Sequence, residues 1–140
     1  MSIINFTAKD VLQGQPIAEG WYPATIASAK LEKNKGGDSI NYVATLEIHL
    51  KGIAKEDRPT VKHFFSAKFL AGVLPFVAAM TGLSRSEMED KAKKGEPIPS
   101  FDFAATEGDE VIVKIKNELF DGRIINKIDG WVNKNEQVPF

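Results

Sequence analysis

The sequence contains no cysteine and only two histidines among its 140 residues. Without cysteine, the chain has no disulfide bonds, no thiolate metal sites and no cysteine nucleophile. The histidines, His49 and His63, both fall within segments expected to be strands, and neither has a serine or an acid at the spacing of a catalytic triad. We therefore expect a protein that is not an enzyme and has no catalytic residues.

Long apolar runs and nucleotide-binding loops are also missing. The longest apolar run, Phe69 to Met80, spans 12 residues and contains a proline, whereas a membrane-spanning helix needs about 20 apolar residues. No phosphate-binding glycine motif is present, because the Gly36-Gly37 pair precedes an expected strand rather than a helix. The first residues lack the pattern of a secretory signal. We expect a cytoplasmic protein with no cofactor and no membrane contact.

Neither sign of charge is in excess, since 18 basic and 19 acidic residues give a net charge of -1. This balance argues against a strongly basic nucleic-acid binder but allows a locally basic surface. Four acids gather before the expected fourth strand, but their spacing matches no metal-binding signature, so a solvated loop is favoured over a magnesium-dependent nuclease and no metal site is expected. These acids are Asp102, Glu107, Asp109 and Glu110.

Alternating apolar residues are the main structural signal that is present. Gly20–Lys33 and Ser39–Leu50 alternate on either side of a Gly-Gly turn, which predicts a long hairpin with one buried side. Thr60–Ser66 is rich in β-branched and aromatic residues and predicts a third strand. On the first strand, one face is expected to carry Tyr22, Ala24 and Ile26, and the other face Thr25, Ala27 and Ala29.

The next segment is rich in helix-forming residues and predicts two short helices or one kinked helix. Pro75 is expected to kink the first piece, Gly82 to end it, and Ser84 to cap the second. A second hairpin follows in Glu110–Trp131, where Asp-Gly is the usual signal of a type I′ turn.

The order strand, strand, strand, helix, strand, strand is that of the OB fold, although other small folds share it. We therefore predict a mainly β protein with one helical segment: a five-stranded Greek-key barrel whose helix lies between strands 3 and 4. Residues 1–132 are expected to form this single domain, with residues 1–18 as an N-terminal extension. Residues 133–140 are expected to be a flexible C-terminal tail, because the polar run before Pro139 offers no apolar face.

In an OB fold, the loop between the first two strands and the loop between the last two flank the binding face. Both loops here combine bases with flexible or aromatic residues, a pattern that suits single-stranded nucleic acid because cations follow phosphates and rings stack on unpaired bases. Core packing of the rings and a plain solvated face for the lysines are the alternatives. The candidate residues are the cations Lys30, Lys33, Lys35, Lys114, Lys116, Arg123 and Lys127 and the rings Trp21, Phe64, Phe120 and Trp131.

Three stretches carry a resemblance to a known family: GWYPATIASAKLEKNKGGDSINYVATLEI, HFFSAKF and GDEVIVKIKNELFDGRIINKIDGW. Covering about half of the chain, they resemble the phage- and plasmid-encoded single-stranded DNA-binding proteins, which have an OB fold. The resemblance implies cooperative, sequence-tolerant coating of single-stranded DNA during replication, recombination or conjugative transfer.

The last two residues, Pro139 and Phe140, resemble the end of bacterial single-stranded DNA-binding proteins, whose tip inserts into pockets on replication and repair partners. This chain departs from that pattern, because the family's tail is strongly acidic and here Glu136 is balanced by Lys134. Edge strands of a partly open barrel can also pair between copies, so a homo-oligomer is a further expectation. The competing interpretation is a β-rich structural or adaptor module, such as a virion component, that binds no nucleic acid.

Overall fold

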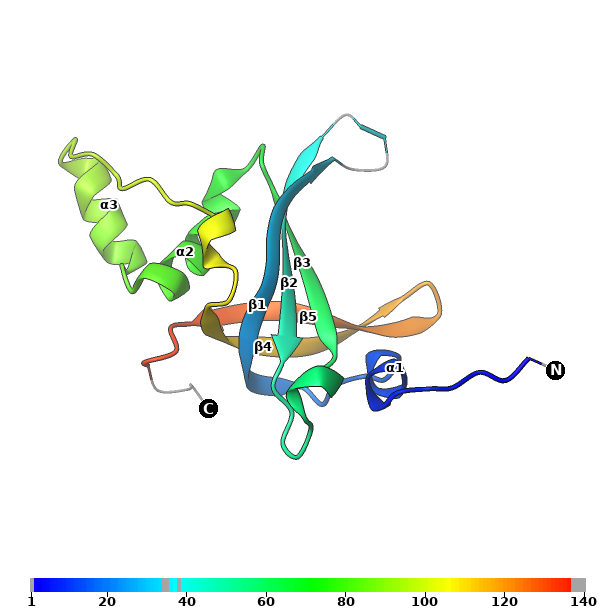
Figure 1. Ribbon diagram of the computed structural model, residues 1–140. Coiled ribbons are helices and arrows are strands. Elements are labelled where there is room, and N and C mark those ends of the chain that lie inside the picture. Colours follow the sequence, from blue (N-terminus) through cyan, green and yellow to red (C-terminus); the bar gives the residue numbers. More distant parts are fainter. Residues whose placement is uncertain (1, 34–35, 38, 137–140) are drawn as a thin grey trace.

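The computed structural model describes residues 2–33, 36–37 and 39–136. Within these residues the protein is mainly β, with five antiparallel strands in one open sheet and three α-helices (Figure 1). The mainly β class predicted from the alternation is confirmed. The strands are β1 (Gly20–Lys33), β2 (Ile40–Ile48), β3 (Thr60–Ser66), β4 (Glu110–Phe120) and β5 (Arg123–Val132), and the helices are α1 (Ala8–Gln13), α2 (Leu74–Thr81) and α3 (Arg85–Lys93).

The strands follow the order β3-β2-β1-β4-β5, so the long strand β1 belongs to two ladders. Its residues from Ala24 onward pair with β2, and its first residues, from Gly20 to Thr25, pair with β4. In Figure 1, β1, β2 and β3 stand side by side, while β4 and β5 cross them. The shared strand thus connects two parts of the sheet that run in different directions.

Because of a bulge in β1, the predicted alternation of its two faces is wrong beyond Ile26. The register with β2 shifts between Ile26 and Ser28, and the extra residue, Ala27, is exposed. Because a bulge adds one residue to one strand, the faces exchange beyond it. Ala29, expected to lie opposite Ile26, is therefore buried on the core side, with 1% of its surface exposed.

The core lies between the two directions of the sheet and is closed at one end by aromatic rings. Phe76 of α2 is fully buried and packs against Trp131 of β5, with ring centroids 4.9 Å apart. Phe65 of β3 and Phe103 complete the cluster, at 5.3 and 5.6 Å from Phe76. Since Phe65 and Trp131 come from the two edge strands, this cluster joins them where the sheet is open.

The helical segment consists of two separate helices rather than one kinked helix. The prediction that Pro75 kinks a helix is wrong. Pro75 lies in the first turn of α2, where a backbone N–H has no partner within the helix, so the missing N–H of proline costs no hydrogen bond. Gly82 ends α2 with a left-handed φ of 77°, as predicted. Ser84 caps α3 as predicted, since its side chain accepts a hydrogen bond from the Glu87 amide at 3.1 Å.

The second hairpin turns at the predicted dipeptide. Asp121 and Gly122 have φ angles of 49° and 75°. Two successive positive φ angles are what a type I′ turn requires, and they match the right-handed twist of the strands. The turn therefore fixes the register in which Phe120 pairs with Arg123.

The N-terminal extension contains a helix that was not predicted, α1. Thr7 accepts a hydrogen bond from the Asp10 amide at 3.1 Å, and the Asp10 carboxylate accepts one from the Thr7 amide at 2.9 Å. At the other end of α1, Gln13 bonds both the amide and the carbonyl of Thr60, at 2.7 and 2.8 Å. These two bonds attach α1 to the start of β3.

At the other end of the chain, the segment expected to be a flexible tail begins with a residue that is attached to the body. Asn133 donates a hydrogen bond to the Ala79 carbonyl of α2 at 2.7 Å. The chain is therefore held in place through Asn133.

Candidate nucleic-acid interface

The outer face of β1, β2 and β3 carries a row of side chains set by strand register. Lys30 of β1 pairs with Val43 of β2, which pairs with Phe64 of β3. One step along the strands, Lys62 of β3 pairs with Thr45. Directly opposite residues in a ladder point to the same face, so Phe64 lies on one surface with both lysines.

Phe64 is the exposed ring of this surface. Its side of β3 alternates with the core side, where Val61 and Phe65 are each 5% exposed, while Phe64 is 57% exposed. A ring of this size at the surface offers a flat apolar platform on the same face as two cations.

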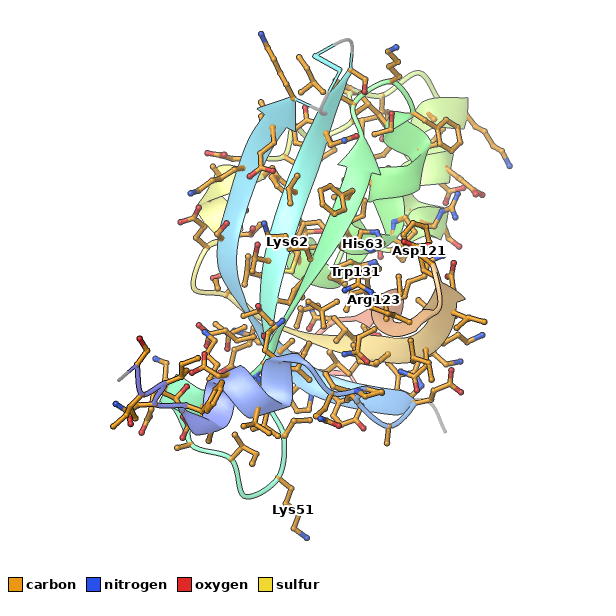
Figure 2. The ribbon with its side chains drawn as sticks, turned by 90° about the vertical axis from the view of Figure 1, so that its right-hand side faces the viewer. Lys51, Lys62, His63, Asp121, Arg123 and Trp131 are labelled. Atoms are coloured by element: carbon orange, nitrogen blue, oxygen red, sulfur yellow. The ribbon has the colours of Figure 1, made fainter. Side chains whose placement is uncertain are left out.

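A groove lies beside this face, between β3 and the β4–β5 hairpin. It encloses about 650 Å³ and is walled by Thr60 and Lys62 of β3, Arg123 and Asn126 of the hairpin, and Gln13 and Gln15 of the N-terminal segment. Figure 2 looks onto this side of the molecule, with Lys62 on β3 and Arg123 on the hairpin. We call it the β3 groove. It has a cation on each of two facing elements.

Hydrogen bonds hold the walls of the β3 groove in place. Asn126 accepts from the Ile17 amide at 2.8 Å and donates to the Gln15 carbonyl at 3.3 Å. Asn117, the partner of Asn126 in the ladder, donates to the Ile17 carbonyl at 3.0 Å. Together with the two bonds between Gln13 and Thr60, they tie the N-terminal segment to both β3 and β5, so the groove is built before any ligand arrives.

A second ladder, that of β1, β4 and β5, carries two other predicted residues. Trp21 pairs with Lys114, which pairs with Gly130. A Cβ at Gly130 would lie 2.9 Å from the Trp21 ring, and the Lys114 ammonium stands 5.8 Å from that ring's centroid. The backbone of Gly130 therefore lies against the Trp21 ring and the Lys114 ammonium lies over it, so less of the ring is free to stack on a base.

The remaining lysines of this ladder are ion-paired. Lys116 lies 3.4 Å from Asp129, and Lys127 lies 3.0 Å from Glu118. All four side chains are about half exposed, so each pair contributes little stability, but it offsets the local positive charge. Of the predicted cations that the structure describes, only Arg123 lines the β3 groove.

The other predicted residues divide into those that are exposed, one that is partly buried, and those outside the described residues. Phe120 is 60% exposed at the tip of the β4–β5 hairpin, and Lys33 is exposed at the end of β1. Trp131, predicted to stack on bases, follows the core-packing alternative, because its ring packs on Phe76 and lies 5.4 Å from His63. Three predicted residues lie outside the described residues: Lys35, Pro139 and Phe140.

Each of the two histidines contacts neighbouring side chains, and the pKa of each is lowered. His63 lies among the rings of Phe65 and Trp131, and burial, followed by the charge of Lys127, lowers its pKa below the ordinary 6.5. His49 shares a hydrogen bond of 2.7 Å with the Thr25 hydroxyl, and its pKa is also lowered, mainly by burial.

Two of the four clustered acids bond the backbone. Glu107 accepts from the Ala29 amide at 3.1 Å, and Asp102 accepts from the Ala105 amide at 3.3 Å. Over the described ranges, no three metal-ligating side chains come together, and no helix has the length and apolarity to cross a membrane.

Lys62 was missed as a site residue, although the sequence contains its signal. In TVKHFFS, period-two alternation places Lys62 and Phe64 on one face and Val61, His63 and Phe65 on the other. The contribution of Gln13 and Gln15 had no such signal, because their position depends on contacts between residues 47 and 111 positions apart.

Comparison with known proteins assigns no family to this arrangement. No protein-family model matches the chain, and a search of curated proteins returned no match.

Proposed function

We propose that this chain is an OB-fold protein that binds single-stranded DNA without catalysing a reaction. The OB assignment is supported by the role of β1 in two ladders and by the two helices between β3 and β4. It is also supported by the approach of the edge strands β3 and β5, whose Phe65 and Trp131 rings lie 5.8 Å apart.

The observation that carries the proposal is the exposed Phe64 ring on one face with Lys30 and Lys62, next to a groove that Lys62 shares with Arg123. Unpaired bases present π faces of about the same chemistry whatever their identity, so a ring that stacks on them tolerates sequence. The cations meet the phosphates, which supply most of the sequence-independent affinity.

Single strands are favoured over duplex because of where the cations and the ring lie. The bases of a duplex are stacked on one another inside the helix and present no free face to Phe64. The β1–β2 and β4–β5 hairpins project from different sides of the molecule, with β3 between them (Figure 1). A flexible strand can follow this surface from Lys30 past Phe64 to Arg123.

The near-zero net charge sets the expected strength. With -1 overall, the chain exerts no long-range attraction on a polyanion, so the affinity depends on the few cations near Phe64. We therefore expect moderate affinity that decreases as salt is added.

The test is a fluorescence-anisotropy titration with labelled oligo-dT and with a duplex of equal length, at several salt concentrations. The account predicts binding to oligo-dT that weakens with salt, little binding to the duplex, and weakened binding after Phe64→Ala. Phe69→Ala is the matched control. Phe69 is an exposed phenylalanine like Phe64, at 67%, but it lies beyond the end of β3, outside the strand that carries the proposed binding face. Equal affinity for duplex, or an unaffected Phe64→Ala variant, contradicts the proposal.

A structural or adaptor module is the second candidate, and the tip of the β4–β5 hairpin favours it. Leu119, Phe120 and Ile124 are 73%, 60% and 57% exposed there. Clustered exposed apolar residues are typical of protein-binding surfaces. If oligo-dT shows no binding at any salt concentration, this second function replaces the first.

A further inference from the structure

Two apolar features of the chain remain without a partner in a single copy. The first is the N-terminal arm, residues 2–6, which leads to the Thr7 cap of α1. Its side chains Ile3, Ile4 and Phe6 are 73%, 72% and 71% exposed. Three large apolar residues in five positions, all mainly in water, need a surface to cover them.

The second feature is an apolar pocket of about 220 Å³ in the helical part of the molecule. Its walls are Tyr42, Leu70, Val77, Met88, Ile98 and Phe101, contributed by β2, the start of the helical segment, α2, α3 and the loop before β4. Leu70 and Ile98 are still 59% and 47% exposed at its edge. We call it the α2–α3 pocket.

We propose that the N-terminal arm of one copy binds in the α2–α3 pocket of a second copy. The dimensions agree, because a cavity of about 150 Å³ holds a benzene ring, and the 220 Å³ pocket is larger than that. Ile4 and Phe6 are two positions apart, so in an extended arm they point to the same side, and Ile4 faces the edge of the pocket when the Phe6 ring enters it. Ile3 then points to the opposite side.

The arm cannot serve its own copy. The N-terminus and α1 lie on one side of the molecule, and α2 and α3 lie on the other (Figure 1). The two hydrogen bonds between Gln13 and Thr60 fix α1 to the start of β3, so the arm starts from a fixed point on the far side. Its five residues extend over only about 17 Å.

Because the arm and the pocket are different surfaces, two copies can exchange arms and close as a pair, or each copy can bind the next and form a ring or a row. This inference goes beyond single-strand binding and requires no nucleic acid.

The buried area sets the strength of the contact. Ile4 and Phe6, exposed by 72% and 71%, offer roughly 300 Å² on the arm, or roughly 600 Å² over both partners. Stable complexes bury about 1,200 Å² or more, so we expect a transient contact that is populated at high local concentration.

Disulfide trapping suits a transient contact, and the absence of cysteine gives a clean background. Two full-length single-cysteine variants of different tag size are mixed and oxidised: Ser2→Cys, which keeps the Ile4 and Phe6 side chains, and Ile98→Cys at the edge of the pocket. The expected result is a mixed disulfide dimer, formed several-fold faster than the product of Ser2→Cys with Lys51→Cys, an exposed collision control. Circular dichroism confirms that each variant is folded.

A second substitution in the arm makes the test specific. In the Ser2→Cys chain, Phe6→Ser is expected to lower the yield, whereas Ile3→Ser, on the opposite side of the arm, is expected to lower it less. Equal yields with Ile98→Cys and Lys51→Cys, or a product mainly with Ile124→Cys of the β4–β5 hairpin, overturn the proposal. Either result leaves the single-strand binding test unaffected, because that test requires no contact between copies.

Discussion

Phe64 and Phe65 are neighbours in β3, but they belong to two different regions of the molecule. Phe65 is 5% exposed and joins Phe76, Phe103 and Trp131 in the ring cluster that closes one end of the sheet. Phe64 is 57% exposed on a surface with lysines. The pleat of a strand is enough to separate them, since successive side chains point to opposite faces. The same residue type therefore contributes stability in one region and is available for binding in the other.

The largest effect that distinguishes the regions is expected from Phe76→Ala. Phe76 is fully buried and contacts several rings, so its removal leaves a cavity in the cluster. We expect a loss of about 3–5 kcal/mol in the free energy of unfolding. Chemical denaturation measures it, with Phe64→Ala as control, expected to stay within about 0.5 kcal/mol. Equal losses in both variants would show that the two regions are not distinct.

Phe64→Ala is expected to produce the reverse pattern in binding. Loss of one stacked base costs about 1–3 kcal/mol of binding free energy. Titration with labelled oligo-dT measures the change, and an unchanged melting temperature shows that the fold is retained. Unaltered affinity in a folded Phe64→Ala protein is incompatible with stacking at this ring.

The cations of the β3 groove are expected to change the salt dependence. Lys62→Ala and Arg123→Ala each remove one phosphate contact, which lowers the slope of log K against log salt by about 0.7 for a single strand. Lys51→Ala is the matched control, because Figure 2 shows Lys51 at the bottom of this side, pointing away from Lys62 and Arg123. The interpretation fails if Lys51→Ala lowers the slope as much as Lys62→Ala.

The smallest expected effect is the contribution of His63 to the pH dependence of stability. Burial lowers the pKa of His63 in the folded state, so below the ordinary pKa of 6.5 the unfolded chain binds more protons than the folded chain. Stability from this group is complete above pH 6.5 and decreases as the pH falls. Melting temperatures between pH 5 and 8 should decrease less steeply towards acid in His63→Gln than in the wild type. Identical pH profiles would show that His63 does not contribute to the pH dependence of stability.

Local patterns predicted the elements well, because strands, caps and turns depend on near neighbours. The bounds of β1 and β3, the Gly82 helix end, the Ser84 cap and the Asp121-Gly122 turn were all predicted from residues a few positions apart. The exposure of Phe120 follows from its place beside that turn.

The rest depends on contacts between distant residues, which a single sequence does not reveal. Alternation alone gives no sign of the bulge at Ala27, which reverses the face of Ala29. Trp131 is packed by rings from β3 and α2, so its burial depends on how the sheet folds over. The β3 groove needs the N-terminal segment, which reaches β5 through Asn126. The candidate residues could be predicted from the sequence, but not that they divide between the face of β1, β2 and β3 and the ladder of β1, β4 and β5.

The most direct test of the account is to map the binding surface by NMR, following the backbone amides of the labelled protein during titration with oligo-dT. We predict that the largest shift changes fall on β3 around Lys62 and Phe64 and on the β4–β5 hairpin at Arg123. The amides around Phe76 should change little, because that region only stabilises the fold. Changes centred on α2 and α3 instead, or no changes at saturating oligo-dT, would contradict the assignment of the β3 surface as the binding site.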